Sequence, residues 1–331
     1  MKIALAAPAR KVCPEEMDFA IHWLSSNGWE PVFDQRLFAA NHIFAGTDIL
    51  RASVIQEYLD RPDIDAIWLA RGGYGSIQII DKLHFTGLVN HPKPFIGFSD
   101  TTVFHGMMQR LGIPSIHASM PYFLDHKTNE ALQSLHDALT GKPLNYQWPA
   151  HPLNRQGTAI GEIVGGNLSV LYSMLGSNSF PDTKNKILFI EEVDEYIYHV
   201  ERMMYGLKRA GKLNQLKALV VGGLTEIHDN PEPFGKTVEQ AIFDMVKEYS
   251  YPVCFGFPAG HQNDNRAIIL GKEMQLSVHA SQVTSYQYLF SQHLLQLFPE
   301  FVLLSKTVII TEGDSHVFGN FLQIAFGVFF Q

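Results

Sequence analysis

The sequence predicts an α/β protein with an open, mostly parallel sheet in its first part and a second, more β-rich α/β region after it. Short apolar runs alternate with helical patterns over the first 120 or so residues, and shorter strand-like runs gather later in the chain. The composition is typical of a folded globular protein, with 46% hydrophobic and 18% charged residues. At 331 residues, two domains are expected rather than one core.

The first part of the chain reads as alternating strands and helices. The apolar runs predicted to be strands are residues 3–7, 66–70, 95–98 and 113–117. The segments predicted to be helices are residues 14–27, 48–59 and 100–111. Continuous apolar runs are typical of parallel strands buried on both faces. An open sheet with helices on both faces follows from this alternation.

The second part mixes helices with more numerous short strands. Its predicted strands are residues 159–164, 187–190, 218–221, 253–255, 267–270 and 274–278. Its predicted helices begin at Leu168 or cover residues 196–209 and 238–249. We therefore divide the chain into residues 1–125, a proline-containing connecting segment 126–156, a second domain 157–285 and a tail 286–331.

The tail is atypical, since it holds ten Phe or Tyr and only four charged residues. We interpret it as a packed or poorly ordered extension, with a membrane contact as the alternative. The apolar stretch 3–7 is shorter than the core of a signal peptide, so a cytoplasmic protein is expected. The net charge of −8 argues against nucleic acid or an anionic membrane as the main partner. Cys13 and Cys254 form no zinc-binding pattern.

The sharpest local feature is Ile96-Gly97-Phe98-Ser99-Asp100-Thr101-Thr102, where a predicted strand meets a predicted helix. A serine at such a junction lies on a tight turn at the carboxyl end of the sheet, as in a nucleophile elbow. The N–H of Asp100, at a helix N-terminus, is placed to stabilise an oxyanion. The pattern departs from G-x-S-x-G because Thr101 replaces the second glycine. A plain helix N-cap at Ser99 or Asp100 remains the alternative.

Four other segments carry polar or glycine residues at predicted strand ends. Arg71-Gly72-Gly73-Tyr74-Gly75 fits an oxyanion cradle or an ordinary tight turn. Glu191 is the first polar residue after a strand, where acidic residues also commonly begin a helix. His261 follows a Gly/Pro-rich loop and suits general-base chemistry. Gly165-Gly166-Asn167 is a turn before a helix and a plausible N-cap.

Together these segments resemble the serine LD-carboxypeptidase family, which includes the murein tetrapeptide carboxypeptidases and the microcin C immunity proteins. The resemblance covers roughly residues 1–280. The matching pieces occur in the family's order: Ala7-Pro8, Phe44-Ala45-Gly46-Thr47-Asp48, Arg71-Gly72-Gly73-Tyr74-Gly75, Gly97-Phe98-Ser99-Asp100, Gly165-Gly166-Asn167-Leu168, Ile190-Glu191-Glu192, Val200-Glu201-Arg202-Met203 and Gly260-His261. Each motif is weak alone, whereas the ordered set is specific. His117-Ala118-Ser119-Met120 departs from the family's usual His-Gly-Pro-Met.

The resemblance implies a catalytic triad of Ser99, Glu191 and His261, working without metal or cofactor. It places the oxyanion hole at the N–H groups of Asp100 and Gly73. It also implies a flavodoxin-like N-terminal domain, a β-rich C-terminal domain and a homodimer. The substrate would be a muropeptide, cleaved at the LD-peptide bond before its terminal D-alanine. Residues expected to bind the substrate are Arg71, Gly72 and Arg202, with the two arginines as candidate partners for its free carboxylate.

Three other functions remain open. The same chemistry could act on a peptidyl-nucleotide antibiotic, which would call for an aromatic side chain such as Trp148 against the base. An inactive ligand-binding relative would not need the three triad residues to converge. A cofactor-dependent oxidoreductase is disfavoured because residues 7–11 lack the glycine fingerprint expected there.

Overall fold

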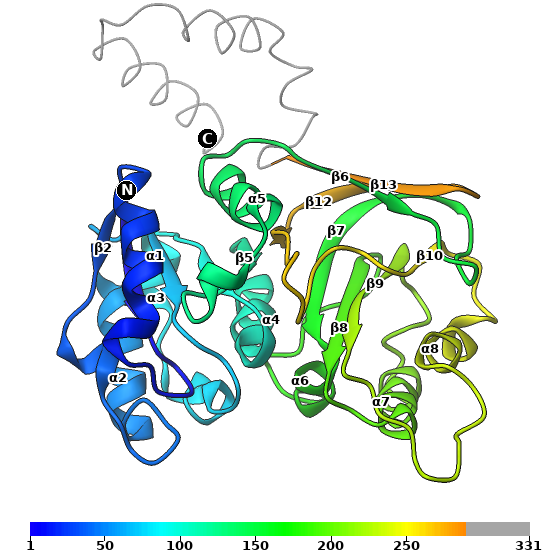
Figure 1. Cartoon of the computed structure of the whole chain (residues 1–331), viewed down its shortest axis with the longest axis horizontal. Coiled ribbons are helices and arrows are strands. Elements are labelled where there is room, and N and C mark those ends of the chain that lie inside the picture. Colours follow the sequence, from blue (N-terminus) through cyan, green and yellow to red (C-terminus); the bar gives the residue numbers. More distant parts are fainter. Residues whose placement is uncertain (289–331) are drawn as a thin grey trace, which may run out of the picture. The chain divides into compact units, whose positions relative to one another are not determined.

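The computed structural model describes residues 1–288, which belong to one compact unit. Two sheets lie side by side in this unit, with helices packed on them (Figure 1). The predicted α/β fold class is confirmed. The first sheet has six strands in the order β11-β5-β4-β3-β1-β2, and the second has seven in the order β10-β9-β8-β7-β12-β13-β6.

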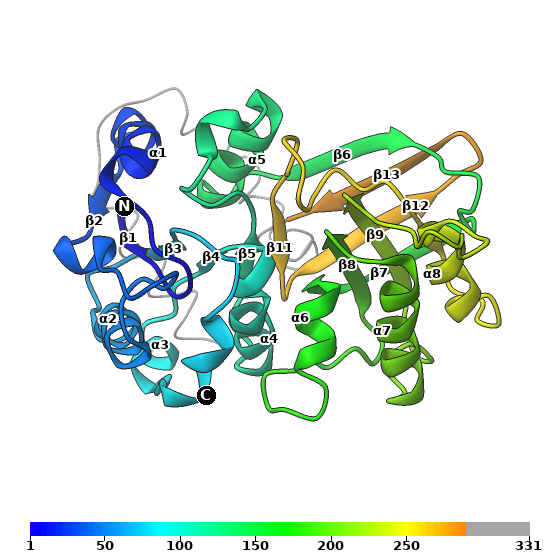
Figure 2. The same cartoon turned by 60° about the horizontal axis from the view of Figure 1, so that its bottom comes forward.

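The first sheet is parallel over five of its strands. These are β1 (Lys2–Ala6), β2 (Glu30–Val32), β3 (Ala66–Leu69), β4 (Phe95–Gly97) and β5 (Ser115–His117). Their spatial order, β2-β1-β3-β4-β5, is that of a flavodoxin-like sheet. Its helices are α1 (Pro14–Ser26), α2 (Asp48–Asp60), α3 (Thr86–Asn90), α4 (Thr102–Arg110) and α5 (Asn129–Leu139). α1 and α5 cover one face, and α2, α3 and α4 cover the other (Figure 2).

The second sheet is mixed. Its strands are β6 (Leu144–Pro149), β7 (Gly157–Asn167), β8 (Ile187–Val193), β9 (Ala218–Thr225), β10 (Val253–Cys254), β12 (Glu273–Val278) and β13 (Gln282–Gln287). β7 to β10 run parallel, while β12, β13 and β6 form an antiparallel extension. One face packs against α6 (Leu168–Ser173), α7 (Ile197–Arg209) and α8 (Val238–Val246).

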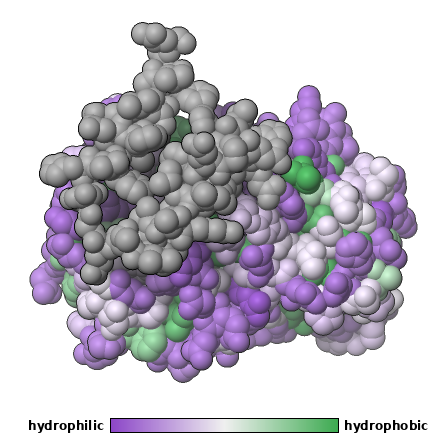
Figure 3. All heavy atoms as spheres, turned by 90° about the horizontal axis from the view of Figure 1, so that it is seen from above, coloured by the Kyte–Doolittle hydropathy of each residue, from purple (hydrophilic) through white to green (hydrophobic). Residues whose placement is uncertain are grey.

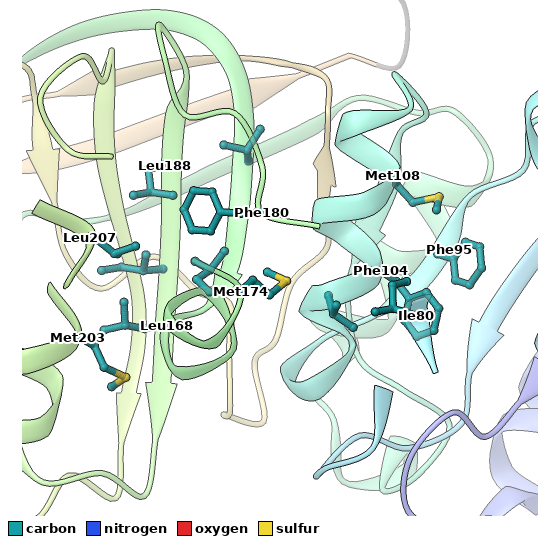
Figure 4. Close-up of a cluster of buried hydrophobic side chains, with 14 of the residues drawn as sticks. Ile80, Phe95, Phe104, Met108, Leu168, Met174, Phe180, Leu188, Met203 and Leu207 are labelled. Carbon is teal, nitrogen blue, oxygen red and sulfur yellow. The ribbon is translucent and has the colours of Figure 1, made fainter. Parts of the chain in front are cut away.

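One hydrophobic core continues from the first sheet into the second. Phe95, Phe104 and Met108 pack on the α4 side, and Leu168 and Leu188 belong to the same cluster on the β7–β8 side (Figure 4). α4 contacts both β7 and α6. The two sheets are therefore joined by packed apolar side chains rather than by a hinge.

Three differences from the predicted elements matter for the site. The segment 126–156, predicted as a connection, contains α5 and β6. The strand predicted at 267–270, assigned to the second domain, is β11 (Ile268–Leu270), and it pairs antiparallel with β5 of the first sheet. β13 includes the first two residues of the predicted tail, and residues 289–331 of that tail lie outside the described residues.

The described surface on the face shown in Figure 3 is mostly hydrophilic, with apolar residues in small separate spots. Within residues 1–288, no helix is long and apolar enough to cross a membrane.

Candidate active site

Ser99 lies on a strained turn between β4 and α4. Its φ of 65° is in the left-handed region, which a non-glycine residue seldom adopts. The turn also needs glycine at position 97, because a Cβ there would lie 2.7 Å from Thr101 Oγ1. The hydroxyl of Thr101 in turn donates to the carbonyl of Phe98 at 2.9 Å. This geometry is that of a nucleophile elbow, with Thr101 closing the turn where a second glycine is usual.

Glu191 lies near the end of β8 and is fully buried. The neighbouring strand β9 has one extra residue here, because Ile190 pairs with Val221 while Glu192 pairs with Leu224. This bulge contains Gly222, where a Cβ would lie 2.5 Å from the carbonyl oxygen of Ala259. The bulge and its glycine therefore let the loop that carries His261 approach Glu191.

His261 follows β10 in a loop whose backbone is held by hydrogen bonds to two side chains. The N–H of Gly260 donates to Asn265 Oδ1 at 2.8 Å, and Thr225 Oγ1 donates to the carbonyl of His261 at 3.0 Å. The ring then bridges the two halves of the site: Nδ1 lies 2.7 Å from Glu191 Oε2, and Nε2 lies 2.9 Å from Ser99 Oγ. The structure thus brings Ser99, His261 and Glu191 into one hydrogen-bonded chain.

The charge of Glu191 controls the ionisation of His261. Burial by itself disfavours the imidazolium, but the adjacent carboxylate outweighs it, so the pKa of His261 is raised above its ordinary value. Ser99 is partly exposed, so a substrate can reach it, whereas Glu191 is screened from water. A carboxylate–imidazole–hydroxyl chain of this kind activates a serine for acyl transfer.

Comparison with known proteins identifies the family of the chain. Residues 3–118 match the LD-carboxypeptidase N-terminal domain, and residues 160–276 match the LD-carboxypeptidase C-terminal domain. The chain belongs to the LD-carboxypeptidase family. Its relatives include the Bacillus subtilis protein named "Probable murein peptide carboxypeptidase", which is 29% identical over 83% of this chain and 88% of that protein.

Two further relatives and one solved structure are similar to this chain over most of its length. The murein tetrapeptide carboxypeptidase of Pseudomonas aeruginosa is 28% identical over 82% of this chain and 91% of its own length. The microcin C7 self-immunity protein MccF of Escherichia coli is 24% identical over 87% of this chain and 93% of its own length. The crystal structure of muramoyltetrapeptide carboxypeptidase from Oxalobacter formigenes has a TM-score of 0.80 and 29% identity, covering 87% of this chain and 99% of that one.

The glycine loop that follows β3 lies against Ser99. A Cβ on Gly72 would be 3.4 Å from Ser99 Cβ, whereas one on Gly73 would meet the side chain of Arg10. In the described part of the chain, the N–H of Gly73 donates to no group. Buried Arg51 holds the loop through the carbonyls of Pro8 and Gly75, and Asp100 accepts from the N–H of Ser76.

The two predicted carboxylate-binding arginines lie in different settings. Arg71 donates to the carbonyl of Lys11 at 3.0 Å, and its guanidinium lies 3.7 Å from the ring centroid of Tyr122. Arg202 is exposed on α7, where its guanidinium lies 5.2 Å from the ring of Tyr198. Neither makes a hydrogen bond or ion pair with Ser99, His261 or Glu191.

The motif Gly165-Gly166-Asn167 connects the two halves of the site. The N–H of Asn167 donates to Thr102 Oγ1 at 3.0 Å, just after the Ser99 turn, and its Nδ2 donates to Glu192 Oε1 at 2.9 Å. A Cβ on Gly166 would lie 2.5 Å from Thr102 Oγ1, so only glycine allows this approach. The sequence singled out the motif as a helix cap, and Asn167 does cap α6.

Lys127 was missed by the sequence analysis. It lies in the segment interpreted as a connection, yet its Nζ donates to the carbonyl of Gln262, next to His261, at 3.0 Å. Trp148 is a core residue: it is buried, and its indole N–H donates to the carbonyl of Phe255 at 3.0 Å. Among residues 1–288, no group of three or more His, Cys, Asp or Glu side chains is placed to hold a metal ion.

Proposed function

We propose that the protein is a serine carboxypeptidase that cleaves the LD-peptide bond before the terminal D-alanine of murein tetrapeptides. The observation that carries the proposal is the chain Ser99 Oγ–His261 Nε2 at 2.9 Å and His261 Nδ1–Glu191 Oε2 at 2.7 Å. The names of the relatives at 28–29% identity support a murein peptide as the substrate.

Ser99 acts as the nucleophile. Glu191 accepts a hydrogen bond from Nδ1–H of His261, which leaves Nε2 free to take the proton of the Ser99 hydroxyl. Ser99 Oγ then attacks the carbonyl carbon of the diamino acid. His261 passes the proton to the leaving D-alanine amine, and water hydrolyses the acyl-enzyme by the reverse roles.

The negative oxygen of the tetrahedral intermediate is stabilised by backbone N–H groups. The proposed donors are Asp100, directly after the nucleophile, and Gly73 in the adjacent loop. The unoccupied donor at Gly73 and the contact of Gly72 with Ser99 support this placement. Gly72 then forms the wall of the site beside the scissile bond.

The deciding experiment is D-alanine release from a purified murein tetrapeptide, measured for the wild type and Ser99→Ala with a chelator present. Release by the wild type and a loss of at least about a thousandfold in Ser99→Ala is the expected result. Turnover by Ser99→Ala at the wild-type rate would overturn the mechanism.

Hydrolysis of a peptidyl-nucleotide antibiotic is the second candidate, since MccF is a relative. The burial of Trp148 in the core removes the aromatic side chain that the sequence offered for stacking on a base. If neither the wild type nor Ser99→Ala releases D-alanine, and the wild type cleaves a peptidyl-nucleotide, the antibiotic-hydrolysing function replaces the murein one.

We further propose that the enzyme works as a homodimer in the cytoplasm. The homodimer is proposed from the family resemblance, and the location is the one expected from the sequence. Light scattering of the purified protein and cell fractionation test them.

A further inference from the structure

A carboxypeptidase must recognise the free carboxylate of its substrate's last residue. Only three covalent bonds separate that carboxylate carbon from the scissile carbonyl carbon, so the two atoms lie within about 4 Å of each other. A carboxylate that leaves water needs a cation or several N–H donors beside it. The group that binds it therefore has to lie next to Ser99.

The arginines expected from the sequence are poorly suited to this task. Arg71 is engaged by the carbonyl of Lys11 and by the face of Tyr122, and Glu16 Oε1 lies 3.9 Å from its Nη1. Arg202 points along exposed α7 toward Tyr198. A different cation in the described chain contacts the neighbours of both Ser99 and His261.

That cation is Lys127, in the turn before α5, and α5 lies beside β6 of the second sheet in both views (Figures 1 and 2). Its Nζ lies 5.9 Å from the ring centroid of Phe98, the residue before Ser99. The ring of His261 lies 4.9 Å from the same phenyl ring. Nζ also donates to the carbonyl of Gln262, the residue after His261.

The backbone around Lys127 is tied to the His261 loop. The N–H of the next residue, Thr128, donates to the carbonyl of Asn263 at 3.2 Å, and Thr128 Oγ1 lies 3.1 Å from Asp264 Oδ1. The lysine therefore starts from a fixed position rather than from a free surface loop. Its ammonium is held at the site at little further cost in side-chain entropy.

The charge of Lys127 is not neutralised within the described chain. Among the described residues, the hydrogen-bond partner of its Nζ is a carbonyl and not a carboxylate, and burial lowers the pKa of Lys127 below its ordinary value. Buried Lys93 differs, since its ammonium donates to the carbonyls of Tyr58 and Arg61 at the end of α2. An ammonium has three N–H donors. Lys127 uses one of them on Gln262, which leaves two for an anion.

We propose that Lys127 binds the C-terminal carboxylate of the substrate and so restricts cleavage to the last peptide bond. The inference rests on the proposed function, and it assigns carboxylate recognition to the segment 126–156 rather than to Arg71 or Arg202. Lys127 acts in binding and orientation, and it takes no part in proton transfer.

The test compares two substrates: the murein tetrapeptide with a free C-terminal carboxylate and the same peptide with a C-terminal amide. Release of D-alanine or D-alaninamide is measured for the wild type, Lys127→Met, Lys127→Arg and Lys142→Met. Lys142 is the matched control, because it lies in the same segment but is exposed and 3.6 Å from Asp137. Labelling of Ser99 by a fluorophosphonate at the wild-type rate checks that each variant is folded, and Lys127→Gln replaces Lys127→Met if the latter fails.

The wild type and Lys142→Met should prefer the carboxylate substrate by about ten- to a hundredfold in kcat/KM. Lys127→Met should lose this preference through a higher KM for the carboxylate substrate alone, and Lys127→Arg should retain part of it. A preference that survives in Lys127→Met, or an equal loss on both substrates, would overturn the inference and leave the proposed function intact. If Arg71→Gln loses the preference for the carboxylate substrate and Lys127→Met keeps it, the inference is also overturned and the proposed function stays intact. No turnover of either substrate by the wild type would overturn both.

Discussion

Glu191 and Glu192 are consecutive residues of β8, and both are buried, yet their side chains have different hydrogen-bond partners. Glu191 accepts from His261 and lies against Gly260. Glu192 accepts from Asn167 Nδ2 and from the N–H groups of Ser169 and Val193. Successive strand residues point to opposite faces of a sheet, so Glu191 faces the candidate active site while Glu192 faces the scaffold.

The two carboxyl groups also differ in the charge of their partners. Glu191 is paired with an imidazole, whereas Glu192 has only neutral donors as partners. Burial raises the pKa of Glu192 to about 7, and the charge of Glu191 adds to this effect. The burial of Glu192 beside a second carboxyl group is therefore tolerated because Glu192 is partly protonated at neutral pH.

The largest expected effect is that of Glu191→Gln. Removing the carboxylate leaves His261 without its orienting charge, and kcat should fall by about a thousand- to ten-thousandfold. Because Glu191 raises the pKa of His261, the acid limb of the kcat/KM profile should lie above the ordinary histidine value in the wild type. In the variant this limb should move to lower pH, as measured from pH–rate profiles of D-alanine release. An acid limb that moves to higher pH would contradict the assignment.

Glu192→Gln is the matched substitution on the other face, and it should change kcat by less than about threefold. Its effect appears instead in stability. The folded-state pKa of Glu192 is raised, so its contribution to stability is fully present below pH 4.5 and is lost as the pH rises through about 7. This loss amounts to up to roughly 3 kcal/mol. Urea unfolding measures the free energy of unfolding at pH 5 and at pH 8. The difference between these two values should be smaller for Glu192→Gln than for the wild type. An unchanged difference would be evidence against this role.

The smallest effect is expected for Asn167→Ala, compared with Thr237→Ala. Both residues cap a helix, α6 and α8 respectively, and losing a cap costs about 1 kcal/mol. Asn167 also donates to Glu192, so its removal should destabilise the protein by about 1 kcal/mol more than the loss of Thr237. Thermal unfolding of the two variants measures this difference, and equal losses would show that the contact with Glu192 contributes nothing.

The part of the site that depends on local sequence could be predicted. The turn at Ser99 follows from a short apolar strand, a glycine and a helix start, and the structure has that turn. The positions of Glu191 and His261 came from the ordered family motifs, because no local pattern says that residues 70 positions apart will meet. The bulge at Gly222, which allows their approach, has no signal beyond two adjacent glycines.

Other features were missed for different physical reasons. α5 and β6 have readable patterns: α5 buries Ala131, Leu135 and Ala138, and β6 alternates buried and exposed residues. The prolines of the segment obscured both elements. Lys127 belongs to no motif, and its role depends on contacts with Phe98 and Gln262 that only the folded chain creates.

The pairing of β11 with β5 has a consequence for modularity. Sequence comparison matches two separate domains, an earlier module at residues 3–118 and a later module at residues 160–276. However, Ile268, Ile269 and Leu270 of the later module complete the edge of the sheet in the earlier one. A fragment ending before β6 would expose β5 as an unprotected edge, open to pairing with another chain. The first sheet is therefore incomplete without a strand from the later half, and the earlier half cannot be exchanged between relatives unless that strand goes with it.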